Sequence, residues 1–236
     1  MQKEHNLTHR DLFNLVQATH DFCTENEIPY AIVGGVGVQS HLVNSITHAS
    51  GGPTSISEDR RNSNIFGRLL RNTNDIDVVM LTDRSNERLD FEIEKYLIQN
   101  LPNFSGLTPK SGTLKVNTNR SEISLQVTTD SVKYKGFEES LFEYQVDSAN
   151  ELELIYSERG PVNRTNVKVP TSEILALPKL SRYSVSDMQD LQNLIRITRI
   201  HGQGFDKNAV KSIAKRYAPN NSHTLVSRLD EIMSTI

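Results

Sequence analysis

The chain has little of what marks secreted, disulfide-stabilised or membrane proteins. Among its 236 residues there is one cysteine, Cys23, and no tryptophan. A lone cysteine excludes an internal disulfide and favours a reducing compartment. It falls in a predicted helix, where a buried, inert thiol is expected. There is no run of about 18 apolar residues, the length that a membrane span needs, and no apolar signal-peptide core at the start. These absences predict a cytoplasmic protein with no membrane contact.

Several function classes are not indicated. The net charge of −3 argues against bulk electrostatic capture of nucleic acid, so any RNA contact would need a local basic patch. The seven histidines form no HExxH motif or zinc-spaced cluster, and no P-loop occurs. The glycines at 34, 35 and 37 lack the later glycine of a dinucleotide fingerprint. Zinc enzymes, P-loop NTPases and Rossmann dehydrogenases are therefore poor interpretations.

An acidic pair stands at the start of a predicted strand. Residues 75–81 read DIDVVML, so Asp75 and Asp77 are separated by one residue. In a strand such residues share a face and stand about 6.6–7 Å apart. Both carboxylates can then converge on a hard cation such as Mg²⁺ or Mn²⁺, which accepts carboxylates together with substrate phosphates. The same pattern also arises at exposed strand ends and in turns, so the pair alone leaves both interpretations open.

A glycine pair lies upstream. The apolar run 29–33 ends in Gly34 and Gly35 and opens into a predicted helix over 36–48. This order exposes backbone N–H groups at a helix N-terminus, where the unpaired donors and the helix dipole favour phosphate. Glycine also permits positive φ and close approach. The alternative is a tight strand-to-helix turn that needs glycine only for its geometry.

Together, Gly34, Gly35, Asp75 and Asp77 resemble the nucleotidyltransferase motif of the DNA polymerase β superfamily. The flanking sequence is similar to the R-x-T-x-D-h-D form found in AbiEii-type toxins and minimal nucleotidyltransferases. The matched positions before the acids are Arg71 and Thr73.

A second block extends the resemblance. Residues 177–182 read LPKLSR and residues 186–191 read SDMQDL. They are similar to the K-h-x-A/S-x-R and K/R-D-x-x-D-L signatures that follow the catalytic domain in this family. Lys179 would then be a point charge for phosphate, with a solvent-exposed lysine at a helix end as the alternative. Arg182 and Asp187 would form a structural or nucleotide-orienting pair, and Asp190 a helix-stabilising one.

The resemblance implies a metal-dependent transfer of a nucleoside monophosphate from NTP to an acceptor. In toxin relatives the acceptor is a tRNA 3′ end or a protein side chain, and a cognate antitoxin is a candidate partner. In antibiotic-modifying relatives it is a small hydroxyl compound. The implied catalytic residues are Asp75, Asp77 and Lys179, with both aspartates holding the metal. The implied nucleotide-binding residues are Gly34, Gly35, Arg71, Thr73, Lys179, Arg182 and Asp187.

The third acid of the family motif is missing. The alternating pattern of 122–128 places Gln126 where a neighbouring strand should supply that acid. Glutamine offers a carbonyl ligand without charge or basicity. Glu122 on the same face, or Asp130 after a bend, would substitute, or the site has two acids only. The alternative function is therefore a catalytically degenerate nucleotide-binding or regulatory module.

Two basic segments have open interpretations. Residues 49–71 form a long insertion between glycines and acids, ending in several arginines. It is either a flap that meets triphosphate or RNA, or a solvated loop. A predicted helix over 206–217 carries further cations, which slightly favour RNA and equally suit a solvated helix face. They are Lys207, Lys211, Lys215 and Arg216.

The order of patterns predicts an α+β fold, with a mixed-sheet nucleotidyltransferase core at 1–170 followed by a C-terminal helical lobe at 171–236. Helices are expected at 8–27, 36–48, 86–99 with Ser85 as N-cap, 171–178, 187–201, 206–217 and 222–235. Strands are expected at 29–33, 75–81, 113–118, 122–128, 131–135, 141–146 and 151–157.

Overall fold

The fold is taken from a computed structural model. It describes residues 9–49, 75–101, 104–110, 113–118, 122–128, 135–138, 140–156, 163–200 and 204–236. The helices are α1 (His9–Glu25), α2 (Gly34–Ala49), α4 (Asn86–Asn100), α5 (Phe142–Asp147), α6 (Ser172–Arg182), α7 (Val185–Ile200), α8 (Lys207–Tyr217), a 3-10 turn (Pro219–Asn221) and α9 (Ser222–Ser234). The strands are β1 (Tyr30–Val33), β2 (Asp75–Met80), β3 (Phe104–Lys110), β4 (Thr113–Thr118), β5 (Glu122–Thr128), β6 (Asn150–Tyr156) and β7 (Asn163–Val169).

A mixed five-stranded sheet forms the centre, in the order β1-β2-β5-β4-β3. β2 and β5 are parallel, and the other neighbours are antiparallel. β6 and β7 make a separate antiparallel pair. The predicted α+β class with a mixed sheet is confirmed.

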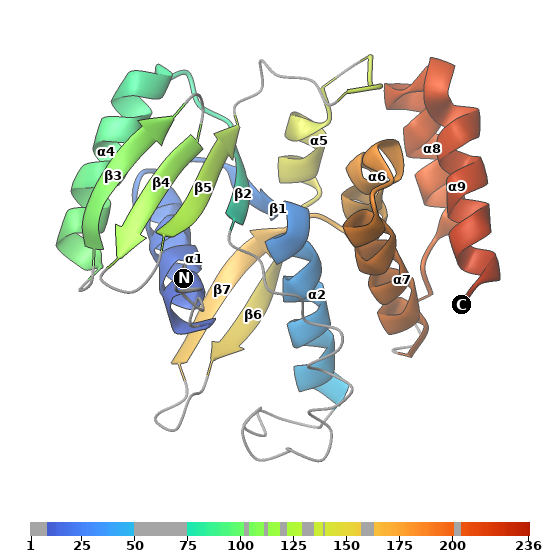
Figure 1. Ribbon diagram of the computed structural model, residues 1–236, viewed down its shortest axis with the longest axis horizontal. Coiled ribbons are helices and arrows are strands. Elements are labelled where there is room, and N and C mark those ends of the chain that lie inside the picture. Colours follow the sequence, from blue (N-terminus) through green and yellow to red (C-terminus); the bar gives the residue numbers. More distant parts are fainter. Residues whose placement is uncertain are drawn as a thin grey trace, which may run out of the picture.

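Alternation along the central strands gives the sheet one apolar and one polar face. Ile76 and Val78 of β2 and Ile123 and Leu125 of β5 are almost fully buried. They share a hydrophobic cluster with the inward residues of α1 and α4, which lie behind β3, β4 and β5 in Figure 1. Asp75 and Asp77, which alternate with Ile76 and Val78 along β2, therefore lie on the opposite face.

Two hydrophobic clusters organise the chain. One joins the sheets with α1, α2 and α4, and the other gathers the inward faces of α6, α7, α8 and α9. The helical cluster lies at the right of Figure 1. Leu175, Leu194 and Ile197 follow residue 170 yet pack in the first cluster, so the two parts share side-chain packing. The predicted division at 170/171 stays a prediction.

Two local predictions are confirmed. Ser85 caps α4, because its side chain accepts a hydrogen bond from the Arg88 backbone N–H at 3.3 Å. Cys23 is fully buried, and burial raises the pKa of its thiol to about 12, so it is inert near neutral pH. Among the described residues, no helix combines the length and apolarity needed to cross a bilayer.

Two element predictions are wrong. Residues 141–146 are not a strand but lie largely in α5, where Leu141, Phe142 and Gln145 are buried at helical spacing. The helix expected to end near Pro178 continues to Arg182. An internal proline removes one backbone hydrogen bond, but Leu177 and Leu180 beside it are fully buried in the second cluster. Their packing outweighs the loss.

Two strands were not predicted. β7 has a clear signal, since Thr165, Val167 and Val169 alternate as buried residues. β3 contains Gly106 and Pro109, which argue against a central strand. It pairs only with β4 at the edge of the sheet, where proline is tolerated. Residue 8, the expected start of the first helix, and residues 131–134 of the predicted strand 131–135 fall outside the described residues, while Lys135 lies in a turn.

Candidate functional site

The turn between β1 and α2 lies directly against an aspartate. Gly34 begins α2 with φ of +63°, a conformation that only glycine adopts without strain. A Cβ added to it would lie 1.8 Å from Oδ2 of Asp77. The register explains this approach, since Val33, the residue before Gly34, pairs with Asp77 across β1 and β2. The glycine turn and the acidic pair, distant in sequence, therefore form one site.

The sheet aligns polar residues of β2 with those of β5. Asp75 pairs with Ser124 and Asp77 with Gln126 in the parallel ladder. Parallel neighbours stand about 4.7–4.9 Å apart and their side chains point to the same face. All four side chains are partly exposed on this face. Two carboxylates flanked by a hydroxyl and an amide are oxygen ligands of the kind Mg²⁺ binds, so the donor set fits that ion.

Gln126, which the sequence resemblance places at the third-acid position, pairs with Asp77. Glu122 lies four residues earlier on β5, about 13 Å along the strand from Gln126 at 3.3 Å per residue. Its carboxylate is exposed and contacts Lys115. The structure thus does not bring Glu122 to Asp77, and Asp130 is outside the described residues. Within the ranges that the structure describes, no group of three or more acidic, histidine or cysteine residues could hold a metal.

Lys115 is a residue on this face that sequence reasoning missed. It lies on β4 and pairs with Ser124, so Lys115, Ser124 and Asp75 form one row across three strands. Its side chain is 31% exposed. The alternation of 114–117 carried the signal, because Leu114 and Val116 are buried and Lys115 must face the other way.

The second sequence block forms a buried ionic cluster between α6 and α7. The Lys179 ammonium donates to Asp190 Oδ2 at 2.6 Å and lies 3.8 Å from Asp187 Oδ1. Arg182 contacts Asp187 through two nitrogens, at 2.8 and 3.3 Å, and Ser184 Oγ donates to Asp187 at 2.7 Å. Burial raises the pKa of Asp187, but these partners outweigh it and hold that pKa below its usual value.

This cluster bears on the role expected of Lys179. The residue is only 1% exposed, which corrects the alternative of a solvent-exposed lysine at a helix end. Its ammonium faces two carboxylates and does not reach the surface, so contact with a phosphate requires another side-chain conformation. The predicted pairing of Arg182 with Asp187 is present, and its orienting of a nucleotide stays a prediction.

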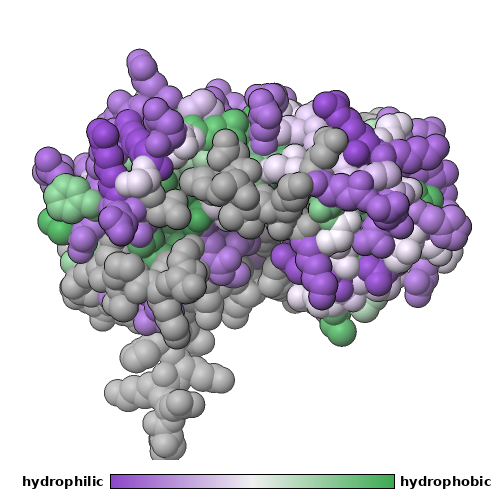
Figure 2. Space-filling view, turned by 90° about the horizontal axis from the view of Figure 1, so that it is seen from above, coloured by the Kyte–Doolittle hydropathy of each residue, from purple (hydrophilic) through white to green (hydrophobic). Residues whose placement is uncertain are grey.

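The remaining sequence candidates are either outside the described residues or on α8. Arg71, Thr73 and most of the insertion 49–71 are outside the described residues. On α8, Lys207 is paired with Asp230 and Arg216 lies over the Tyr217 ring at 5.1 Å. The face over the C-terminal helices in Figure 2 is mostly hydrophilic, as expected for solvated helices.

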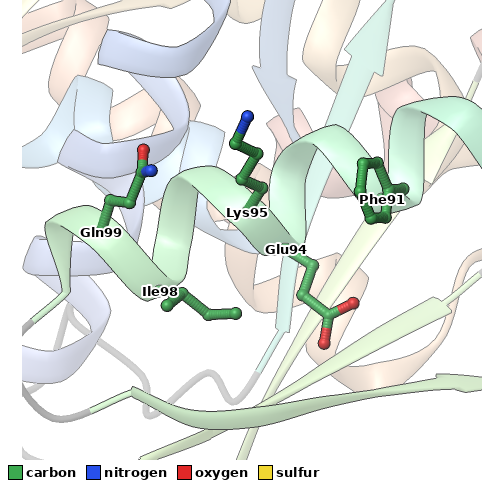
Figure 3. A pocket seen from close by; sticks show the side chains of 5 residues that line it. All are labelled: Phe91, Glu94, Lys95, Ile98 and Gln99. Carbon is green, nitrogen blue, oxygen red and sulfur yellow. The ribbon is translucent and has the colours of Figure 1, made fainter.

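A shallow hollow lies on α4, where Figure 3 shows its lining side chains along one side of the helix. Phe91 and Ile98 are 66% and 60% exposed. The opposite side of α4, with Leu89 and Ile93, packs in the core. The hollow thus faces away from the sheet and is no part of the acidic site.

Substituting Gly34 by Ala tests the turn. We expect the left-handed conformation alone to cost about 1–2 kcal/mol of unfolding free energy, with a further loss because the methyl group displaces the Asp77 carboxylate. Urea denaturation measures the sum. Gly204 is a matched control, since it also has positive φ, of 58°, but an added Cβ meets nothing within 4 Å. Equal losses at both glycines would contradict a special contact at Gly34.

No family model and no curated protein matches this chain. One similar solved structure is an antigenic nucleotidyltransferase-like protein from Paracoccidioides brasiliensis, with 18% identity, a TM-score of 0.45 and coverage of 93% of this chain and 94% of that chain. Another is the antibiotic-resistance factor ANT(2'')-Ia, with 10% identity, a TM-score of 0.43 and coverage of 97% and 94%.

A third is the CdnE cyclic dinucleotide synthase of Elizabethkingia meningoseptica, with 11% identity, a TM-score of 0.29 and coverage of 95% and 82%. These scores are too low to transfer a function to this chain.

Proposed function

We propose that the protein is a metal-dependent nucleotidyltransferase, which moves a nucleoside monophosphate from NTP to an acceptor hydroxyl. The observation that carries the proposal is the contact between Gly34 and Asp77. It joins a helix N-terminus, which favours phosphate, to a pair of carboxylates suited to Mg²⁺. A helix N-terminus alone, or a pair of carboxylates alone, would not indicate this substrate. Side by side, they can bind the phosphates and the cation of a metal–triphosphate complex.

The residues have distinct roles in this proposal. Asp75 and Asp77 hold the divalent cation, Mg²⁺ or Mn²⁺, and the N–H groups of Gly34 and Gly35 face the triphosphate. When bound, the cation neutralises phosphate charge and orients the substrate. Positioning and electrostatic stabilisation then supply most of the rate.

The chemical step is a displacement at phosphorus. The acceptor oxygen forms a bond to the α-phosphorus of NTP, the bond to the bridging oxygen breaks, and pyrophosphate leaves with that electron pair. The acceptor proton passes to water, since Gln126 offers no basic oxygen beside Asp77. A slow reaction is therefore expected.

The finer assignment follows the sequence resemblance. We place the protein with AbiEii-type and minimal nucleotidyltransferases in the DNA polymerase β superfamily, acting in the cytoplasm. Arg71 and Thr73 would assist nucleotide binding, as would Arg182. A tRNA 3′ end or a protein is the candidate acceptor, and a cognate antitoxin the candidate partner. Toxicity on expression that a neighbouring gene relieves would support the toxin assignment.

Incubation with each labelled NTP, Mg²⁺ and total tRNA or protein tests the proposal. We expect label transfer, reduced about a hundredfold by Asp77→Asn because a neutral amide holds the cation that stabilises the transition state less well. Asp83→Asn is the matched control, since this exposed carboxylate follows β2 outside the site and should leave transfer unchanged. Equal transfer by wild type and Asp77→Asn would refute the proposal.

The second candidate function is a nucleotide-binding or regulatory module without catalysis. Gln126 beside Asp77 favours it, because the third acid is replaced by a neutral amide. It predicts that NTP binds with Mg²⁺, that Asp77→Asn weakens binding, and that no acceptor is labelled. Equilibrium binding of labelled NTP, measured beside the transfer assay, separates the two functions.

A further inference from the structure

Lys115 places a positively charged side chain on the face of the sheet that carries Asp75 and Asp77. The row formed by Lys115, Ser124 and Asp75 crosses β4, β5 and β2, so these side chains share one face. The Lys115 ammonium contacts the carboxylate of Glu122, whose side chain is 51% exposed. An exposed ion pair of this kind is weak, so the ammonium can readily exchange Glu122 for another anion.

The strands on either side of β2 indicate whether Lys115 lies nearer to the triphosphate or to the acceptor. On one flank lie β1 and the start of α2, where Gly34 touches Asp77. On the other lie β5 and then β4 (Figure 1). A triphosphate at the start of α2 occupies the first flank. The acceptor must then approach over β5 and β4, and Lys115 stands on that side.

We propose that Lys115 determines acceptor specificity by binding a phosphate next to the acceptor hydroxyl, exchanging its Glu122 partner for that phosphate. This proposal rests on the proposed function and narrows its acceptor to a phosphate-bearing one, either a free nucleotide or the end of a nucleic-acid strand. A cationic small molecule would be repelled by Lys115, and a neutral protein hydroxyl would gain nothing from it.

The first experiment measures transfer to two acceptors, AMP and a short single-stranded RNA. We expect Lys115→Gln to raise the KM for the acceptor about tenfold, the worth of one hydrogen bond to a charged group. The KM for NTP and kcat should stay unchanged, which a general structural defect would not produce. Glu122→Gln should lower the acceptor KM. An effect on RNA alone identifies a strand end, and an effect on both acceptors shows that a free nucleotide suffices.

The second experiment needs no transfer. Fluorescence anisotropy follows binding of the labelled RNA at increasing KCl concentration. Losing one phosphate contact should make the slope of log K against log salt shallower by about 0.7 for a single strand. Lys95→Gln is the matched control, since Lys95 is exposed on α4 at the opposite side of the sheet and should leave the slope unchanged.

Three outcomes would overturn the inference: Lys115→Gln alters neither acceptor KM nor salt slope, it alters only the KM for NTP, or the wild type labels only a protein or a cationic compound. Binding that depends on Lys115 with no transfer to any acceptor would instead refute the transferase and retain Lys115 as a phosphate-binding residue.

Discussion

Replacing Gln126 by Asp is expected to raise the rate of nucleotidyl transfer by about 10²- to 10⁴-fold, the usual contribution of a positioned general base. Gln126 pairs with Asp77 and is partly exposed on the acidic face. A carboxylate there can accept the acceptor proton that otherwise passes to water. Single-turnover transfer measures the gain. The assay uses saturating Mg²⁺, because the cation offsets the repulsion among the three carboxylates.

The pH dependence and two control variants make this result specific. The gain should appear above about pH 4, where an aspartate is ionised, and vanish below it. Gln126→Asn changes length without adding charge, and Ser124→Asp adds a carboxylate in the neighbouring row, beside Asp75. Neither should reproduce the gain. A Gln126→Asp protein that binds NTP with Mg²⁺ yet transfers no faster would contradict the assignment of this position.

Replacing Lys179 by Met is expected to lower the free energy of unfolding by about 3–5 kcal/mol, the cost of breaking a buried ion pair from one side. The side chains of Lys179 and Asp190 are 2% and 4% exposed, and 2.6 Å separates their charged atoms. Removing the ammonium takes the cation away from the buried carboxylate of Asp190, beside Asp187. Urea denaturation measures the loss.

The double variant Lys179→Met with Asp190→Leu is the control, because replacing both partners by apolar groups removes the stranded charge. Its stability should return close to that of the wild type. If Lys179→Met kept full stability and lost transfer, the ammonium would have the direct phosphate contact that the sequence resemblance implies.

The sequence predicted the structure best in strands whose buried and exposed residues alternate. Alternation over 75–80 and 122–128 predicted two strands with opposite faces, and Gln126, expected from that alternation beside the acidic strand, pairs with Asp77. The same rule failed at 141–146, because a short amphipathic helix and a short strand both bury apolar residues at mixed spacing. The set of buried residues distinguishes the helix from the strand, and that set depends on tertiary packing, which the local sequence does not show.

Lys179 shows a second limit. Its spacing to Arg182 and Asp187 is visible in the sequence, but a lysine at the end of a helix is ordinarily solvated. Only the packing of α6 on α7 reveals that its charge is enclosed. The contact of Gly34 with Asp77 has the same origin, since it depends on the antiparallel register of β1 and β2.

The parallel pairing of β2 with β5 also determines when, during synthesis, the acidic face of the sheet is completed. A parallel neighbour is reached only by a crossover, and here α4, β3 and β4 intervene between the two strands. Contacts between distant segments close slowly. A chain that stops before β5 lacks Ser124 and Gln126, which pair with Asp75 and Asp77, and is therefore expected to leave the acidic face incomplete.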